Sequence, residues 1–184
     1  MKGFTLLEVL ISLAILFVCL SLGVPSLLNM QNTYMVDKQV ITLKKQLNYA
    51  RFQAIHLGTR VTVCPLDKFG KCQSNWKNGY SIFVDNQKMG LFTEESDLLL
   101  VKNQLSNNLS LKYNGGKKIV FDSIGTLDSG SGTFQFCLPT DTKAIWSRAL
   151  IVSLAGRVRS SYDIDGDGVD EKYYSNKKSD LTCS

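Results

Sequence analysis

The sequence predicts an α+β protein in which one long N-terminal helix packs on an antiparallel β-rich head. Three observations predict it: an apolar, almost uncharged run over residues 4–24, a helical repeat of apolar positions within residues 25–58, and short β-type runs separated by turn residues over 59–184. The 184 residues suit one domain plus an anchoring helix. We therefore expect a transmembrane helix, an amphipathic helix and a head with a disulfide-tied C-terminal tail.

The apolar run from Phe4 to Val24 contains a single charged residue, Glu8. A secretory signal peptide has an apolar run of about 7–15 residues, whereas this run has 21 positions and can span ~30 Å of hydrocarbon. A charge inside the membrane costs roughly 2.5–3.5 kcal/mol, so Glu8 needs a partner or a purpose. The run predicts a membrane span with an additional function, and a plain membrane anchor is the alternative.

The second half of the helix is predicted to be amphipathic. Pro25 ends the apolar span, and we expect it to kink or locally melt the helix. Beyond Pro25, apolar residues recur at alternating spacings of four and three, and Gly58 is a natural stop. This seam consists of Val36, Val40, Leu43, Leu47, Ala50, Ala54 and Leu57. We expect it to pack on the head, and a coiled-coil interface with other helices is the alternative.

The head is predicted to be built from eight short antiparallel strands separated by glycine-rich and asparagine-rich turns. The predicted strands are Arg60–Cys64, Tyr80–Asp85, Leu98–Val101, Leu109–Tyr113, Lys118–Phe121, Thr133–Cys137, Ala149–Leu154 and Arg157–Tyr162.

Four of the five cysteines fall in the head, and they predict disulfide bonds. Cys64 and Cys72 close a short loop, which favours their pairing and leaves Cys137 to pair with Cys183. Zinc is the competing interpretation, but no CxxC spacing occurs and the single histidine, His56, falls on the helix. An oxidising compartment such as a periplasm is therefore expected for the head.

The N-terminus carries a specific resemblance. Residues 2–8 (KGFTLLE), followed by the apolar helix, resemble the class III signal of type IV pilins and type II secretion pseudopilins. The resemblance implies that residues 1–3 are a leader, that a prepilin peptidase cuts between Gly3 and Phe4, and that Phe4 is then N-methylated. It also implies that Glu8 pairs with the new amine, on its own chain or a neighbour's, and so sets the register between stacked helices. Pilins often have a proline at the place of Pro25.

The head resembles the GspH/FimT family over residues 48–61 (NYARFQAIHLGTRV), Cys64-Pro65, 76–85 (WKNGYSIFVD) and 151–159 (IVSLAGRVR). This resemblance implies two β-sheets packed on the helix and a minor filament subunit. Such a subunit sits in the bacterial inner membrane with its head in the periplasm. Its partners are other pilins or pseudopilins, the prepilin peptidase and the assembly platform. The motifs leave open a subunit that primes or tips a type IV pilus and a minor pseudopilin of a type II secretion system.

A pair of arginines predicts a phosphate-binding surface. Arg157 and Arg159 alternate along a predicted strand and so project to one side, and paired arginines bind phosphates without reading base sequence. In FimT-type members the Gly-Arg-x-Arg motif resembles the element that contacts DNA in natural transformation. Arg148 and Lys143, as well as Lys117-Lys118, would extend the patch if the fold brings them close. Bridging between subunits and charge on an edge strand are the alternatives.

An acidic loop predicts a calcium site. Asp163, Asp165 and Asp167 alternate and a glycine follows, as in the first half of an EF-hand loop. Tyr174 stands where the final bidentate glutamate belongs, and Glu171 at the ninth position is the expected substitute or water-mediated ligand. We expect weak calcium binding, and an acidic turn without a ligand is the alternative.

The composition and the motifs do not indicate an enzyme. The net charge of +5 permits weak contact with nucleic acid or anionic surfaces. The chain has no Gly-x-Ser-x-Gly elbow and no P-loop, and its one histidine provides no usable catalytic pair. The expected catalysed event is carried out on the chain, between Gly3 and Phe4.

Overall fold

The structure is a computed structural model that describes residues 3, 5–87, 90–102, 109–174 and 177–183. The chain divides into two compact units, Met1–Met35 and Val36–Ser184. One helix, α1 (Leu6–Leu57), begins in the first unit and ends in the second. The described residues of the second unit also form ten strands and two short 3-10 helices, η1 (Trp76–Asn78) and η2 (Glu95–Asp97). The predicted α+β class with antiparallel strands is confirmed.

The first unit consists of the apolar part of α1 and the residues before it. By length and composition, α1 is the one helix among the described residues that could cross a membrane. The sequence predicts that Pro25 kinks or locally melts the helix, but the helix is continuous through Pro25, so it does not melt there. A proline removes one backbone hydrogen bond, and the intact turns on either side can hold the helix across that gap.

The part of α1 in the second unit packs on the head along the predicted seam. Six of the seven seam residues are at most 5 % exposed: Val36, Val40, Leu43, Leu47, Ala50 and Ala54. Leu57 is 47 % exposed, so its predicted burial is wrong. The helix ends there. The N–H of Thr59 donates to the carbonyl of Ala54 and the N–H of Gly58 donates to the carbonyl of Ile55, which are the two hydrogen bonds of a Schellman cap. The chain therefore turns away before Leu57 meets the head.

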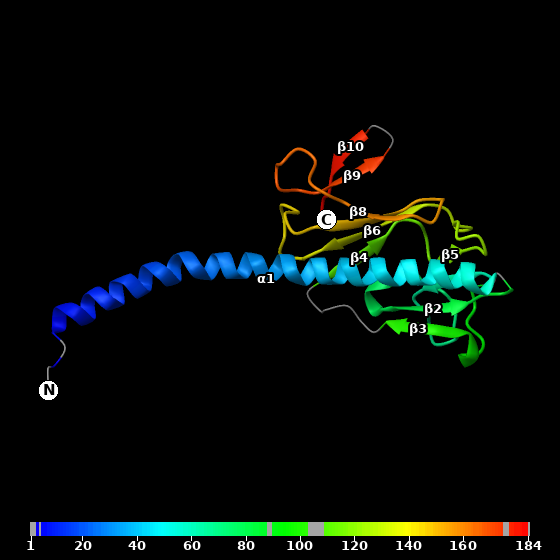
Figure 1. Cartoon of the computed structure of the whole chain (residues 1–184), viewed down its shortest axis with the longest axis horizontal. Helices are drawn as coiled ribbons and strands as arrows, with labels where there is room; N and C mark the ends of the chain where they lie inside the picture. Colours follow the sequence, from blue (N-terminus) through cyan, green and yellow to red (C-terminus); the bar gives the residue numbers. More distant parts are fainter. Residues whose placement is uncertain (1–2, 4, 88–89, 103–108, 175–176, 184) are drawn as a thin grey trace. The chain divides into compact units, whose positions relative to one another are not determined.

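Two four-stranded antiparallel sheets form the body of the head. The first has the strand order β3-β2-β1-β5 and consists of β1 (Val61–Cys64), β2 (Tyr80–Val84), β3 (Leu98–Lys102) and β5 (Ile119–Phe121). The second has the order β4-β6-β7-β8 and consists of β4 (Ser110–Tyr113), β6 (Gly132–Cys137), β7 (Arg148–Val152) and β8 (Val158–Ser160). Figure 1 shows β2 and β3 on one side of the second half of α1, and β6 and β8 on the other.

The eight predicted strands are all present, with ends shifted by a few residues. At the β7–β8 turn, β7 ends at Val152 and β8 begins at Val158, because Ser153 and Arg157 close the hairpin. A third, two-stranded sheet of β9 (Glu171–Tyr174) and β10 (Lys177–Asp180) was not predicted.

Aromatic rings fill the core of the head. Trp76 from η1 meets Tyr113 of β4 and Phe134 of β6 edge to face, with ring centroids 5.2 and 4.8 Å apart. Trp76 and Phe134 are at most 1 % exposed. Buried rings that meet edge to face stabilise a core beyond what their buried apolar area alone provides.

Two disulfides tie the loops to this core. Cys64 bonds to Cys72 and Cys137 bonds to Cys183, which is the pairing that the sequence favours. The second bond joins the end of β6 to the C-terminal tail, and Cys19 is free and exposed.

Candidate functional site

The N-terminal processing motif lies at the start of α1. Phe4, the residue predicted to be N-methylated, is outside the described residues, so the structure does not place the Gly3–Phe4 bond. Glu8 is in the first helical turn and exposed, and its N–H donates to the hydroxyl of Thr5 (3.3 Å). Thr5 and Glu8 stand in the Thr-x-x-Glu spacing of a capping box, so the side chain of Thr5 fixes where the helix begins. An acidic side chain in the first turn also suits the helix dipole.

The arginine pair lies beside a surface hollow at the β7–β8 turn. Arg157 and Arg159 are exposed, whereas Val158 between them is buried, which is the alternation expected of a strand. Both arginines line a hollow of about 650 Å³ together with Asn114, Ser131 and the end of β7. No carboxylate among the described residues lines this hollow. Its polar lining therefore consists of two guanidinium groups, hydroxyls, amides and backbone.

Arg51, on the outer flank of the seam, holds this turn in place. Its Nε donates to the carbonyl of Gly125 (2.8 Å) and its Nη2 to the carbonyl of Ala155 (3.1 Å). One guanidinium group thus joins α1 to the β5–β6 turn and to the β7–β8 turn. A Cβ on Gly156 would lie 2.0 Å from the Gly125 carbonyl oxygen, so the two turns are in direct contact. The role of Arg51 could not be predicted from the sequence, because its partners are carbonyls 74 and 104 positions away in the chain.

Asp122 shapes the β5–β6 turn that offers this carbonyl. Desolvation raises the pKa of Asp122. The hydrogen bonds from the Thr126 hydroxyl and from the N–H groups of Thr126 and Ile124 lower this pKa by more than desolvation raises it. The pKa is therefore held below its usual value. The Gly125 carbonyl reaches Arg51 from a turn whose own conformation is fixed by a carboxylate.

Arg148 and Lys143 do not line the hollow at Arg157 and Arg159. The prediction that they extend the phosphate-binding surface is therefore wrong. Arg148 begins β7, whereas Val152 at the other end of that strand pairs with Val158. Four steps of ~3.3 Å along a strand place Arg148 roughly 13 Å away from the turn. Lys143 is exposed in the loop before Arg148, and neither residue lines the hollow.

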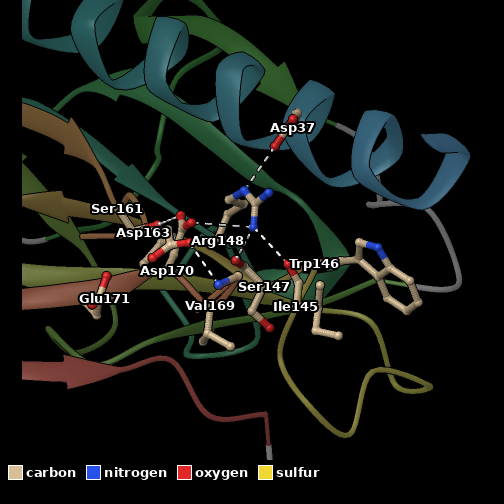
Figure 2. A network of polar contacts seen from close by, with 12 residues as sticks. Asp37, Ile145, Trp146, Ser147, Arg148, Ser161, Asp163, Val169, Asp170 and Glu171 are labelled. Atoms are coloured by element: carbon tan, nitrogen blue, oxygen red, sulfur yellow. Dashed lines mark hydrogen bonds and ion pairs between the residues drawn. The ribbon is translucent and has the colours of Figure 1, made fainter. Parts of the chain in front are cut away.

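Arg148 serves instead as the centre of a structural network, shown in Figure 2. Its Nε lies 3.3 Å from Asp37 of α1 and its Nη1 lies 3.7 Å from Asp170 of the acidic loop. The same Nη1 donates to the carbonyls of Ser147 (2.8 Å) and Ile145 (3.2 Å). Helix, second sheet and acidic loop meet at one guanidinium group, which was not visible in the sequence because the three segments are far apart there.

The acidic loop brings together three of its four predicted ligands. Carboxylate oxygens of Asp163, Asp165 and Glu171 lie within 4.8 Å of one another, and Asp167 is not in this group. Glu171 is 2 % exposed and one of its oxygens accepts the N–H of Ile164 (2.7 Å). Asp163 accepts the N–H groups of Gly166 (2.7 Å) and Gly168 (2.9 Å). The loop is folded around its own carboxylates, and their oxygen chemistry is of the kind that calcium accepts.

A long helix with an apolar first half and a two-sheet head defines a pilin-like subunit. The family described as type II transport protein GspH matches residues 39–156, and a prokaryotic N-terminal methylation motif matches residues 1–24. The first match spans more than half of the chain, and the chain therefore belongs to the GspH family. This family consists of structural minor pilins and pseudopilins, so the chain is a subunit of this kind and not an enzyme.

Two solved structures share the fold. The type IV minor pilin FimU of Pseudomonas aeruginosa is 22 % identical with a TM-score of 0.54, over 67 % of this chain and 86 % of that one. The minor pseudopilin EpsH from the type 2 secretion system of Vibrio cholerae is 12 % identical with a TM-score of 0.50, over 68 % and 94 %. Among curated proteins, none matches the chain.

Proposed function

We propose that this chain is a minor pilin that primes or tips a type IV pilus, with its helix anchored in the inner membrane and its head in the periplasm. The observation that carries the proposal is Glu8, the single charge in the apolar first half of α1, placed in the first turn next to the predicted cut. Cleavage after Gly3 frees an amine at Phe4, and in a low dielectric this amine pairs with a carboxylate only when both are charged and well placed. Glu8 thereby fixes the axial position of neighbouring helices during assembly.

The exposed apolar side chains of α1 in the first unit are the surface on which other pilins pack. The prepilin peptidase and the inner-membrane assembly platform are the partners that cut the chain and insert it into the filament. A carboxylate that finds its partner only on assembly explains why a costly charge is kept in the membrane.

The alternative is a minor pseudopilin of a type II secretion system, and the family description and the likeness to EpsH favour it. Deletion of the gene, scored together for twitching, DNA uptake and protein secretion, separates the two. Loss of twitching with normal secretion is expected for the pilin. Loss of secretion with normal twitching would assign the chain to the secretion system instead.

We further propose that the head binds double-stranded DNA through Arg157 and Arg159 without reading its sequence. The support is their common exposure at one hollow that no described carboxylate lines. Two guanidinium groups give weak, salt-sensitive binding, because phosphate contacts act by releasing counterions. A gel shift of the Arg157→Gln/Arg159→Gln variant should show weaker binding, with Lys143→Gln as the control. Equal binding by the arginine variant and the wild type would refute this proposal.

For the acidic loop we propose weak calcium binding by Asp163, Asp165 and Glu171. The supporting observation is that three side chains in EF-hand spacing place their oxygens within 4.8 Å of one another. Because the final bidentate glutamate is missing, the affinity should suit the millimolar calcium found outside cells. Titration calorimetry should record heat with calcium and none after Asp163→Asn/Asp165→Asn. An absence of heat from the wild type at millimolar calcium would end the proposal.

A further inference from the structure

A second surface hollow, of about 680 Å³, lies at the end of the first sheet. Three lysines from two segments line it: Lys71 from the loop closed by the first disulfide, and Lys117 and Lys118 from the turn between β4 and β5. Cys72, Gly90 and Leu91 complete its apolar wall. This lysine pocket is distinct from the hollow at Arg157 and Arg159, which no residue of this set lines.

The wall of the lysine pocket is fixed by covalent and backbone bonds. Cys72 is bonded to Cys64 at the end of β1, and its N–H donates to the carbonyl of Gly90 (3.3 Å). Lys71 and Leu91 pair as an isolated antiparallel bridge. The loop segment that carries Lys71 is therefore held against residues 90–91 before any ligand binds. A preformed wall lowers the ordering cost of binding.

The lysines of the pocket have no ion-pair partner among the residues that the structure describes. No salt bridge among these residues joins Lys71, Lys117 or Lys118 to a carboxylate, and no carboxylate among them lines the pocket. The acids nearest by sequence and bonding are engaged in other contacts. Asp67 accepts the N–H groups of Phe69 (2.8 Å) and Lys71 (2.9 Å) through one carboxylate oxygen. Asp85 accepts the N–H of Gly90 and the Thr62 hydroxyl (2.9 Å each), and Asp128 pairs with Arg60 at 2.9 Å.

The side chain of Lys118 folds over the wall of the pocket. A Cβ built on Gly90 would meet the Nζ of Lys118 at 2.8 Å and its Cδ at 3.0 Å, so this half-buried ammonium group lies directly against Gly90. Its position keeps a positive charge at the wall. Like charges around one hollow repel each other, and an anion placed between them removes that repulsion and gains attraction to each.

We propose that the lysine pocket binds the phosphate group of a ligand. Lysine ammonium groups act as compact point charges for phosphate, and three of them offset more charge than one carboxylate carries. A phosphate monoester or diphosphate therefore matches the pocket better than a single carboxylic acid. The phosphate can belong to a free compound or to a nucleic-acid backbone. Asn114 lines the hollow at Arg157 and Arg159, and the next residue, Gly115, lines the lysine pocket. The two hollows therefore lie on either side of one turn.

The test is titration calorimetry of the full chain in non-ionic detergent micelles with inorganic pyrophosphate. The Lys71→Gln/Lys117→Gln/Lys118→Gln variant keeps the side-chain stems and removes three charges, and its affinity should fall about tenfold or more. The control, Lys38→Gln/Lys45→Gln/Lys143→Gln, loses the same charge from exposed lysines that do not line the pocket, and it should bind like the wild type. Circular dichroism confirms that both variants are folded.

Three results would overturn the inference: no binding by the wild type, equal loss in the control, or loss after Arg157→Gln/Arg159→Gln but not in the lysine variant. A parallel titration with a short DNA duplex identifies the source of the phosphate. Weaker duplex binding by the lysine variant assigns it to the nucleic-acid backbone, and unchanged duplex binding assigns it to a free compound. Failure of the wild type to bind duplex, with pyrophosphate still bound, would refute the DNA proposal and leave this inference standing.

Discussion

Gly156 offers a test of how the arginine-bearing turn is held. Its φ is +70°, and a side chain in this left-handed region costs about 1–2 kcal/mol. Its added Cβ would also lie 2.0 Å from the backbone oxygen of Gly125, which no rotamer change relieves. The two turns must separate, and one of the two hydrogen bonds from Arg51 breaks, at about 1.5–3 kcal/mol for a charged donor. We expect Gly156→Ala to lose about 3–5 kcal/mol of unfolding free energy.

Gly130→Ala is the matched control. Gly130 has a φ of +88° and no atom within 4 Å of a Cβ, so only the conformational cost of about 1–2 kcal/mol applies. Urea unfolding of both variants in detergent micelles, followed by the fluorescence of the buried Trp76, gives the two free energies. The Gly156 variant should be the less stable by about 2–3 kcal/mol. Equal stabilities would refute the idea that the two turns and Arg51 form one packed unit.

Four further substitutions test the network around Arg148, the turn shaped by Asp122 and the C-terminal tail. Arg148→Met should cost about 2–4 kcal/mol in urea unfolding, because it leaves the buried Asp170 carboxylate without its cation, whereas Asp37→Asn at the exposed end of the network should cost less than about 1 kcal/mol. Equal costs would contradict this ranking. The lowered pKa of Asp122 gives stability that is complete above the pKa of the unfolded chain and is lost as pH falls through the lower folded value, so Asp122→Asn should flatten the decline of stability on acidification below about pH 4. An unchanged pH profile would speak against it. Cys183→Ser should lower stability by about 2–4 kcal/mol and open the tail to proteolysis, and an intact tail under protease would disprove its dependence on the disulfide.

Local patterns predicted much of this fold. The seam on α1 was predictable because burial repeats with the helical period, and the strands because turn residues separate short β-type runs. The same reasoning failed at Leu57, which continues the apolar repeat but is 47 % exposed, because no described part of the head covers its side chain. It also missed β9 and β10, whose segment contains many lysines and acids and lacks the alternation of a half-buried strand.

The candidate sites were predicted only as far as their residues are close in sequence. Arg157 and Arg159 could be predicted to share a face because every second residue of an extended chain points to the same side. The exclusion of Arg148 could not be foreseen, because it depends on Asp37 and Asp170, which lie 111 positions before it and 22 after it. Arg51 and the lysine pocket likewise depend on loops that only the sheet topology brings together.

A chain that is assembled into a filament must first be processed at its N-terminus, and tandem mass spectrometry of the mature protein from its native membrane identifies that terminus. We expect the first residue to be Phe4 carrying an N-methyl group, with residues 1–3 removed. A protein that retains Met1, or that begins downstream of the apolar segment, would contradict the assignment. In the first case the Phe4 amine would not be free to pair with Glu8, and in the second case Glu8 itself would have been removed. Either result would end the proposed role in helix register.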